Sequence, residues 1–433
     1  MNREVWITGA GVASALGTDL VTVAEAQREG RSGAVSMRSA IDAEFEVGAC
    51  CRVPNWDLEA LVGDLAAPLV GRADRKAEFG WYAAIRALEQ SFGDLATAQR
   101  RVAQDPRRAA IHLASGLVST PVEEANSDLL SCFVGEHYDH GRGATRLRHP
   151  SPYRARHFTD RVNHLVAGLL GSQGPSLVNH GACAAGGVAI GTGARWIRRG
   201  KADLVVAGGF ESMIHPFGVL SFQMLGALSE RRDCDPSQVS RPFDRTRDGF
   251  VIGEGAAVLV LEAADHARAR GALCLGRVLG VGTSLDAYRV TAPPPDGHGA
   301  AAAMSAALRD AGVAPADVDY INAHGTGTPL NDAAETAAIH TVFGPTSQAP
   351  PTSSSKSGIG HAVAAAGAVE AVLCLLAMAD GILPPTLNLH EPDPLCDLDN
   401  VPLVAREARP KTVLSNSFGF GGVNASLVLG APA

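Results

Sequence analysis

Short apolar runs alternate along the chain with longer stretches in which apolar residues recur at helical spacing. The apolar runs predict strands at residues 4–11, 108–115, 202–209, 253–262, 274–284 and 318–325. The periodic stretches predict helices at residues 76–92, 184–200, 299–313 and 364–381. The segment 415–430 is predicted to form a loop followed by a terminal strand. Strands that alternate with helices in this way predict an α/β fold whose sheet is buried on both faces.

The alternation of strands and helices runs through the chain twice, with a seam near residue 262. A chain of 433 residues is long enough for a large core built from two fused halves. We therefore expect an N-terminal half at 1–262 and a C-terminal half at 263–433. The segment 119–160 differs because it is polar and rich in His and Arg, and we expect it to form a cap over the core.

Charge and cysteine content narrow the function classes. The net charge of −8 argues against nucleic-acid binding by the chain as a whole. The eight cysteines form no C-x-x-C pair and lack the spacing of a disulfide framework, so a reducing cytoplasm is expected. The N-terminus does not resemble a signal peptide, because Glu4 opens its apolar run. The most apolar stretch, 361–385, carries Glu370 and Asp380, which favours a buried helix over a membrane span.

The first candidate for chemistry is Cys183, which stands in LVNHGACAAGG between an apolar run and a helical stretch. A thiol at the start of a helix lies near the positive end of the helix dipole, so we expect a pKa below the usual value of about 8.5. Its small neighbours leave room for a substrate. Taken alone, an inert buried cysteine is the more frequent outcome, because free cysteine usually behaves as a small hydrophobic residue.

Two histidines in glycine-rich junctions between strands and helices change that balance. His324 follows an apolar run in NAHGTGTPLND, and His361 lies in SSSKSGIGHAVAAAGAVEA between Lys356 and Glu370. Loops at strand ends are where α/β folds place their chemistry. A cysteine and two histidines in such loops form a candidate nucleophile with two candidate bases.

Three other kinds of site find no support in the sequence. The stretch TGAGVASALG begins like a dinucleotide-binding loop, but Ser14 stands where the third glycine is required. The chain has no G-x-S-x-G motif for a serine hydrolase. Its histidines lack the clustered spacing of a zinc site.

Several segments, in order along the chain, resemble the β-ketoacyl-acyl-carrier-protein synthases, which are elongating condensing enzymes of the thiolase superfamily. They are VWITGAGVASALG, the Cys183 segment, RPFDRTRDGFVIGEGAAVLVLE, DAYRVTAPPPDG, HGTGTPLND, KSGIGHAVAAAGAVEA and NSFGFGGVNASL. The resemblance covers nearly the whole chain. It implies a thiolase fold, in which two pseudo-repeated α/β halves form a layered αβαβα arrangement, with a cap insertion around 119–160.

The resemblance also implies a ping-pong decarboxylative Claisen condensation that elongates a fatty-acid, polyene or polyketide chain. Cys183 would take the acyl group from the phosphopantetheine arm of an acyl carrier protein. His324 and His361 would promote decarboxylation of malonyl-carrier protein by hydrogen bonding to its thioester carbonyl. Lys356 would orient the second histidine, His361, and Glu370 would be the buried acidic partner of Lys356.

The glycine loop SFGFGG completes the implied site. In the family this loop supplies a backbone N–H to the acyl oxyanion hole, and Phe420 would belong to the catalytic set by gating the acyl pocket. Asp286 and Thr291 would share a mobile loop beside the gate. The residues that we expect to contact substrate are Thr326, Thr328, Thr291, Phe418, Gly421 and Leu117.

The implied partners are an acyl carrier protein, in its acyl and malonyl forms, and a second subunit. Carrier proteins are acidic and this chain is net acidic, so docking requires a local basic patch. We expect that patch at Arg72, Arg75 and Lys76, with Arg195, Arg198 and Arg199 as a second candidate. The family forms dimers, so we expect a homodimer or a heterodimer with a chain-length-determining homologue. We expect no bound cofactor, nucleic acid or membrane.

The chain departs from the family's pattern at several positions. Gly181 replaces the usual threonine beside the nucleophile, His180 precedes it, and Arg289 stands in the mobile loop where a related enzyme has histidine. These departures favour a specialised pathway as readily as housekeeping fatty-acid synthesis. One alternative is a non-catalytic partner that limits chain length, which would lose the cysteine. Another is a biosynthetic thiolase, which would carry a second cysteine near the C-terminal loop.

Overall fold

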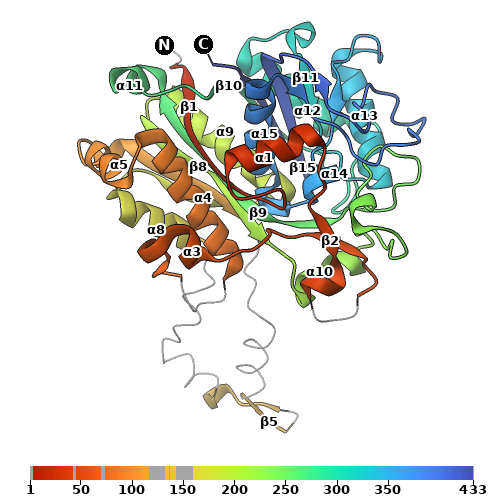
Figure 1. The fold of residues 1–433 in the computed structure, drawn as a ribbon, viewed down its shortest axis with the longest axis horizontal. Helices are drawn as coiled ribbons and strands as arrows, with labels where there is room; N and C mark the ends of the chain where they lie inside the picture. The colour runs from red at the N-terminus through yellow and green to blue at the C-terminus, as the bar shows by residue number, and fades with distance from the viewer. Residues whose placement is uncertain are drawn as a thin grey trace.

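The computed structural model describes residues 3–41, 45–69, 74–116, 132–135, 137–142 and 159–432 (Figure 1). Leu117, Arg72 and most of the expected cap at 119–160 lie outside these residues. The described part of the cap contains a short antiparallel hairpin formed by β5 (Phe133–Val134) and β6 (His137–Tyr138). That this segment covers the core therefore stays a prediction.

A twelve-stranded mixed sheet forms the frame of the molecule, and its main path reads β12-β11-β15-β16-β10-β1-β9-β8-β4-β7. The strands from the first half of the chain are β1 (Val5–Ala13), β4 (Ala109–Ser115), β7 (Ser176–Asn179), β8 (Leu204–Ser212) and β9 (Ile252–Ala263). Those from the second half are β10 (Gly276–Leu285), β11 (Tyr320–Asn322), β12 (Thr352–Ser353), β15 (Thr412–Gly419) and β16 (Val423–Gly430). Off this path, β2 (Ala34–Ser36) pairs with β3 (Ala49–Cys51), which in turn pairs with β9. A separate two-stranded sheet consists of β13 (Ile382–Leu383) and β14 (Arg406–Glu407).

The order of strands repeats between the two halves. From its outer edge, the first half has the strand order β7-β4-β8-β9-β1, and the second has β12-β11-β15-β16-β10. In both halves, the third of these strands along the chain lies at the edge and is followed by the second, fourth, fifth and first. The halves meet where β1 and β10 pair antiparallel, with Trp6 opposite Arg277 and Ile7 opposite Gly276. The boundary at 262 stays a prediction, because β9 runs to Ala263 and both halves share one sheet.

Helices form three layers around the strands of the two halves (Figure 1). The inner helices α9 (Ala185–Arg198) and α15 (Ala366–Asp380) pack against each other and contact strands of both halves. Helix α4 (Arg75–Phe92) packs on β1, β9 and β8 from outside, and α12 (His298–Ala311) packs on β10 and β16, with α13 (Pro329–Phe343) beside it. The other α-helices among the described residues are α1 (Leu20–Glu29), α2 (Met37–Ala40), α3 (Leu58–Val62), α5 (Leu95–Val102), α8 (Arg161–Leu170), α10 (Pro216–Met224), α11 (Ala264–Ala269) and α14 (Lys356–Ile359).

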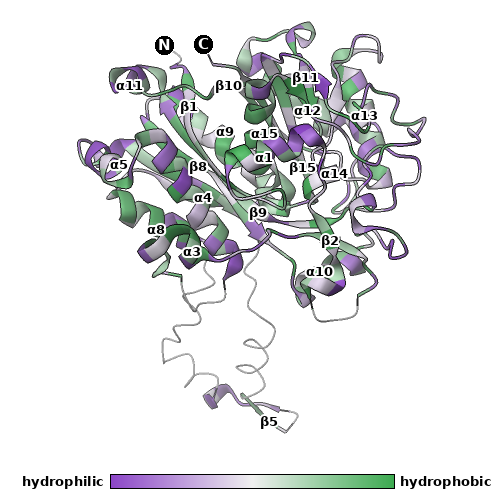
Figure 2. Cartoon of the chain, in the orientation of Figure 1, coloured by the Kyte–Doolittle hydropathy of each residue, from purple (hydrophilic) through white to green (hydrophobic). Residues whose placement is uncertain are grey.

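The main hydrophobic core lies around the inner helices. It joins Ile190 and Ile197 of α9 to Val372 of α15 and to strand residues of both halves. Hydrophilic residues follow the outward faces of helices such as α1 and α5 (Figure 2). Within the described residues, one helical stretch, Val363–Asp380, is long and apolar enough to span a membrane, but most of it is buried inside the fold. Its burial is that of a core helix, as expected for 361–385.

Each predicted strand and helix corresponds to an observed element, with its ends displaced by a few residues. The prediction that 415–430 begins with a loop is wrong, because β15 runs through Gly419 between β11 and β16. Its buried polar side chains are satisfied by one another rather than by water. The Ser426 hydroxyl donates to Asn416 Oδ1 at 2.8 Å, and Asn322 Nδ2 donates to Ser415 Oγ at 3.3 Å. Polar residues here therefore do not indicate exposure.

Candidate active site

Cys183 lies in a short turn that leads from β7 into the inner helix α9. The chain leaves β7 at Asn179, forms the 3₁₀ turn η4 (Ala182–Ala184), and enters α9 at Ala185. Ala182, at the start of the turn, has a φ of 46°, a conformation that non-glycine residues rarely adopt. The turn leaves the Cys183 side chain buried but facing a pocket.

The electrostatic environment of Cys183 differs from the expectation. Burial raises the pKa of the thiol to about 11, so the prediction of a lowered pKa is wrong. Three influences act in the lowering direction: the charge of Lys356 and the backbone N–H groups of Phe420 and of Cys183 itself. The desolvation of the sulfur exceeds their combined effect. The group is therefore a protonated thiol at neutral pH that becomes a nucleophile on losing its proton.

The glycine loop between β15 and β16 approaches the nucleophile closely. A Cβ added at Gly419 would lie 3.1 Å from the Cys183 backbone nitrogen and 3.2 Å from the Gly181 oxygen, so only glycine fits without displacement. This approach brings the Phe420 N–H to the Cys183 sulfur. The same two N–H groups, from Phe420 and Cys183, are placed to stabilise a negative oxygen that develops on an acyl carbon bound to that sulfur.

The two histidines come from the second half and meet beside the thiol. His324 follows β11, and His361 follows α14. Their rings lie edge to face with centroids 5.3 Å apart. Burial and the nearby charge of Lys356 lower the pKa of both imidazoles well below the usual range. Both are therefore neutral at neutral pH, and each carries one N–H donor.

Lys356 and Glu370 form a fully buried ion pair behind the histidines. Lys356 Nζ contacts the Glu370 carboxylate, which projects from α15. The same ammonium donates to Nδ1 of His324 at 3.3 Å. The resemblance led us to expect that Lys356 orients His361, but its hydrogen bond goes to His324. Because Nδ1 of His324 accepts, Nε2 carries the proton and is the donor that this ring offers.

Glu335 lines the pocket but was not singled out from the sequence. It projects from α13 and accepts hydrogen bonds from the backbone N–H of His324 at 2.9 Å and of Gly325 at 2.8 Å. Asn416 Nδ2 donates to it at 3.1 Å. Burial raises the pKa of this carboxyl to about 7. An available signal was the spacing of Asp332 and Glu335, which places two acids on one face of an otherwise Ala-rich helix.

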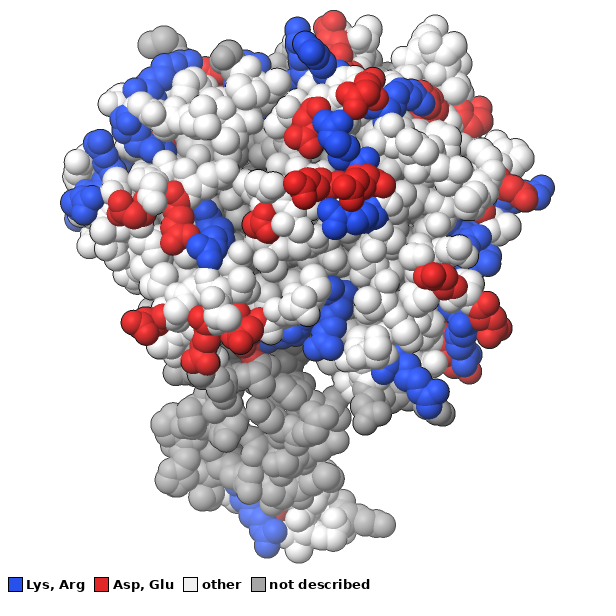
Figure 3. Space-filling model, in the orientation of Figure 1, with Lys and Arg blue, Asp and Glu red and all other residues white. Residues whose placement is uncertain are grey.

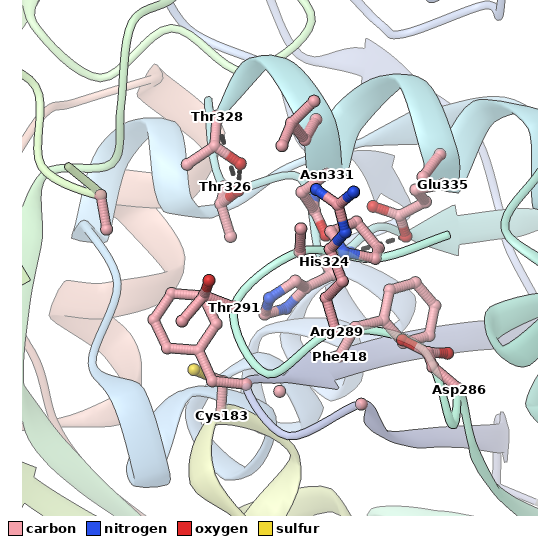
Figure 4. A pocket seen from close by; sticks show the side chains of 18 of the residues that line it. Cys183, Asp286, Arg289, Thr291, His324, Thr326, Thr328, Asn331, Glu335 and Phe418 are labelled. Atoms are coloured by element: carbon pink, nitrogen blue, oxygen red, sulfur yellow. Dashed lines mark hydrogen bonds between the residues drawn. The ribbon is translucent and has the colours of Figure 1, made fainter. Parts of the chain in front are cut away.

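One pocket of about 290 Å³ is lined by Cys183, both histidines and Glu335 (Figure 4). It gathers the expected residues Cys183, His324, His361, Thr326, Thr328, Thr291, Phe418 and Phe420. Apolar residues that the sequence analysis did not single out complete the wall, including Phe222, Leu225, Phe250 and Leu330. Lys356 and Glu370 lie behind this wall. The pocket is therefore an apolar channel that ends at a thiol and two imidazoles.

Gly421 does not line the pocket, which corrects its expected contact with substrate. Its N–H instead donates to the Val290 carbonyl oxygen at 2.6 Å. A second bond joins the Asp286 N–H to the Gly422 oxygen at 2.9 Å, and Asn424 Nδ2 donates to Asp286 Oδ1 at 2.6 Å. The loop that carries Asp286 and Val290 is thus fastened to the glycine loop at two points.

The expected carrier-docking patch is corrected in part. The Arg75 guanidinium makes a bidentate ion pair with buried Glu254, at 2.6 Å and 3.0 Å, and also donates to the Val53 carbonyl. Lys76 is only 4% exposed. Lys76 is therefore not available to a docking partner, and the charge of the partly exposed Arg75 is already paired with Glu254. Figure 3 shows basic and acidic side chains interspersed over much of the face drawn.

The two unusual residues before the nucleophile also lie outside the pocket wall. His180 is exposed, and its Nδ1 lies 2.8 Å from the Ser115 carbonyl oxygen. Gly181 donates its N–H to Asn179 Oδ1 at 2.8 Å. Neither contributes to the described lining. Their effect on acyl-chain selection therefore stays a prediction.

Comparison with known proteins agrees along the whole chain. The protein-family model described as Beta-ketoacyl synthase, N-terminal domain, matches residues 2–267 of this chain. The family model described as Beta-ketoacyl synthase, C-terminal domain, matches residues 275–390. The 3-oxoacyl-[acyl-carrier-protein] synthase 2 of Coxiella burnetii is 38% identical over 431 residues, which cover 99% of this chain and 98% of that protein. A putative polyketide beta-ketoacyl synthase 1 of Streptomyces cyaneus is also 38% identical, over 435 residues that cover 100% and 99%.

Solved structures give the same result. A beta-ketoacyl synthase from Burkholderia phymatum has a TM-score of 0.85 at 32% identity, with both chains covered completely. A type II polyketide synthase ketosynthase, solved in complex with its acyl-carrier protein and bound to the hexaketide, gives 0.86 at 31% identity, again with complete coverage. The fold and the site are those of a thiolase-fold condensing enzyme. Within that class, the chain belongs to the beta-ketoacyl synthase family.

Proposed function

We propose that this chain is a β-ketoacyl-acyl-carrier-protein synthase that acts by ping-pong decarboxylative Claisen condensation. The observation that carries the proposal is the meeting of Cys183, His324 and His361 in one pocket, with the Phe420 N–H directed at the sulfur. Relatives that bear the names 3-oxoacyl-[acyl-carrier-protein] synthase 2 and polyketide beta-ketoacyl synthase support it. The product is an acyl chain extended by the malonyl-derived unit.

In the first half-reaction, Cys183 sulfur attacks the thioester carbonyl of an acyl group carried on phosphopantetheine. A carbon–sulfur bond forms to Cys183 and the bond to the arm breaks. The proton lost by the Cys183 thiol balances the proton gained by the leaving thiolate. Because burial raises the pKa of Cys183 to about 11, attack is coupled to that proton loss. The N–H groups of Phe420 and Cys183 stabilise the oxyanion that develops during attack.

In the second half-reaction, the malonyl thioester loses carbon dioxide and the bonding electrons pass to its α-carbon. The enolate oxygen that develops accepts hydrogen bonds from the neutral imidazoles of His324 and His361. The α-carbon then attacks the acyl group on Cys183. A carbon–carbon bond forms, the carbon–sulfur bond breaks, and the released Cys183 thiolate takes one proton from water. Lys356 acts through His324, because it fixes which ring nitrogen of His324 donates.

Several pocket residues bind the arm and the acyl chain in this proposal. The hydroxyls of Thr326 and Thr328 are hydrogen-bonded to each other at 2.9 Å and offer polar partners to the pantetheine amides, together with Thr291. Phe418 and Phe420 bound the apolar part of the channel. Substrates arrive on phosphopantetheine, and no resident cofactor takes part.

The proposed partners are an acyl carrier protein and a second ketosynthase-type subunit. One structural neighbour is a ketosynthase in complex with its acyl-carrier protein, and another is the ishigamide ketosynthase/chain length factor, with a TM-score of 0.83 at 33% identity. Within the described residues, the outer side of β7 has no strand partner, which leaves an edge for pairing with a second chain. All eight cysteines lie among the described residues and form no disulfide there, which supports action in the reducing cytoplasm.

The test is capture of the acyl group. We expect incubation with acyl-carrier protein to add the acyl mass to Cys183, and added malonyl-carrier protein to discharge it as the elongated product. Cys183→Ala should abolish the adduct, whereas Cys234→Ala, which removes a thiol outside the pocket, should retain it. A wild-type protein that forms no adduct would overturn the proposal and favour a non-catalytic chain-length partner.

A further inference from the structure

The pocket contains one cationic side chain that the proposed chemistry does not use. Arg289 is the only Lys or Arg among the described residues that line the pocket. Figure 4 shows its side chain extending from the loop after β10. Its guanidinium lies 5.4 Å from the ring centroid of Tyr288. Within the described part of the chain, it forms no ion pair and no hydrogen bond.

The two carboxylates of the pocket wall, Asp286 and Glu335, accept hydrogen bonds from other groups, and neither forms an ion pair with Arg289 among the described residues. Asp286 accepts from Asn424 at 2.6 Å, and Glu335 accepts from the backbone of His324 and Gly325. The side chains around the mouth are apolar and exposed: Leu225, Val290 and Leu330. A guanidinium without an ion-pair partner, beside apolar side chains at the mouth, attracts an anion on the ligand that passes through it.

We propose that Arg289 binds the phosphate of the phosphopantetheine arm as the arm enters the pocket. This inference rests on the proposed function. The thioester must reach buried Cys183, so the arm is threaded with its thioester end innermost and its phosphate end at the mouth. Arg289 is exposed at that outer end. A guanidinium matches a phosphate through two parallel N–H donors, which lysine does not reproduce. Arg289 is therefore a positioning residue.

The position of Arg289 links the phosphate to the oxyanion donor. Its neighbour Val290 accepts the Gly421 N–H at 2.6 Å, and Asp286, at the start of the same loop, donates to Gly422. Gly421 directly follows Phe420, whose N–H points at the Cys183 sulfur. A phosphate held by Arg289 therefore favours the loop position that keeps the Phe420 donor in place.

The test uses two substrates that differ only in the phosphate: an acyl-phosphopantetheine and the corresponding acyl-pantetheine. We expect Arg289→Gln to slow acylation of Cys183 by the first about fivefold, the upper range for an exposed ion pair, and to leave the second unchanged. Arg289→Lys should keep part of the effect. Arg309→Gln, which removes an exposed charge on α12 outside the pocket, should change neither rate.

The outcomes separate the possible explanations. An equal loss with both substrates, or no loss with either, overturns the role of Arg289. Acyl-carrier protein and acyl-coenzyme A both present a phosphate: a loss with acyl-carrier protein supports contact with the carrier's arm, and a loss confined to acyl-coenzyme A overturns it. A wild-type protein that acylates Cys183 with none of these substrates refutes the proposed function instead.

Discussion

The two halves of the molecule contain the same local structure at the start of their inner helices. In the first half, the 3₁₀ turn η4 leads into α9, and in the second, η7 (Val363–Ala365) leads into α15. The first residue of each turn has a left-handed backbone, with a φ of 46° at Ala182 and 44° at Val363. When the turns are matched in this way, Ala364 stands at the position of Cys183. The same backbone turn therefore occurs in both halves, but only the turn of the first half carries a thiol.

When the two turns are matched in the same way, His180 corresponds to His361, and the two side chains differ in burial. His180 is exposed and its ring bonds to Ser115 and Thr159. His361 is buried, edge to face with Phe250 at 5.1 Å and with His324. The repeated fold therefore supplies two equivalent turns, whereas the chemistry depends on which side chain of each turn faces the shared pocket.

The largest expected effect comes from moving the thiol between the two turns. Cys183→Ala should lower condensing turnover by a factor on the order of 10⁴ or more, because the covalent intermediate cannot form. The double variant Cys183→Ala/Ala364→Cys should recover no acylation, since a sulfur at 364 lacks the Phe420 N–H. The single variant Ala364→Cys is the control for folding and should stay acylated at Cys183. Acyl mass at position 364 would contradict this account.

The next effect concerns the ion pair that only the second half possesses. The turn match places Pro175 and Ala189 in the first half where the second has Lys356 and Glu370. Lys356→Met leaves Glu370 as an unpaired buried carboxyl, so the free energy of unfolding should fall by roughly 3–5 kcal/mol, measured by urea denaturation. Lys356→Met/Glu370→Leu should regain most of the stability but not the activity. Stability unchanged in the single variant would show that the pair is not needed by the fold.

The two histidines of the matched turns give a smaller but sharper contrast. His361→Ala should lower malonyl-carrier decarboxylation by roughly 10²–10³, as expected for losing one oxyanion donor. His180→Ala should leave that rate unchanged, because this ring lies outside the pocket wall. The release of carbon dioxide measures both. Equal losses in the two variants would mean that the halves are functionally equivalent at this position.

The smallest effect is the pH dependence of the thiol. Because burial raises the pKa of Cys183 to about 11, its alkylation by iodoacetamide should rise about tenfold per pH unit from pH 7 to 10. The raised pKa has a matching consequence for stability, which is full at low pH and declines as the pH rises toward about 11. The thiol of Ala364→Cys should react more slowly at every pH. A plateau in Cys183 alkylation near neutral pH would contradict the direction of the shift.

Features set by local pattern could be predicted from the sequence, whereas those set by distant partners could not. Strand and helix positions and the membership of Cys183, His324 and His361 in one site follow from periodicity and ordered motifs. The pKa of Cys183 could not be predicted, because it depends on how deeply the tertiary structure buries the thiol. Arg75 looks like a surface cation in the sequence, but its partner Glu254 is 179 positions away.

Glu335 and β15 are further examples in which the burial of polar residues could not be predicted from the sequence. Glu335 is a charged residue of α13, but its carboxylate is buried and accepts from the backbone of His324 and Gly325. The polar residues of β15 suggested a loop, but Ser415 and Asn416 are buried and bonded across strands. Sequence polarity indicates exposure only when no partner from another element satisfies the group.

Because each half supplies different residues of the site, fragments of the chain have a use of their own. Cys183 comes from the N-terminal half, whereas both histidines and the Phe420 donor come from the C-terminal half. Two polypeptides divided after residue 262 would each lack part of the site, and each would expose one side of the inner helices. Any activity of such a pair would therefore report reassembly alone, which makes the division a complementation assay with no background from either piece.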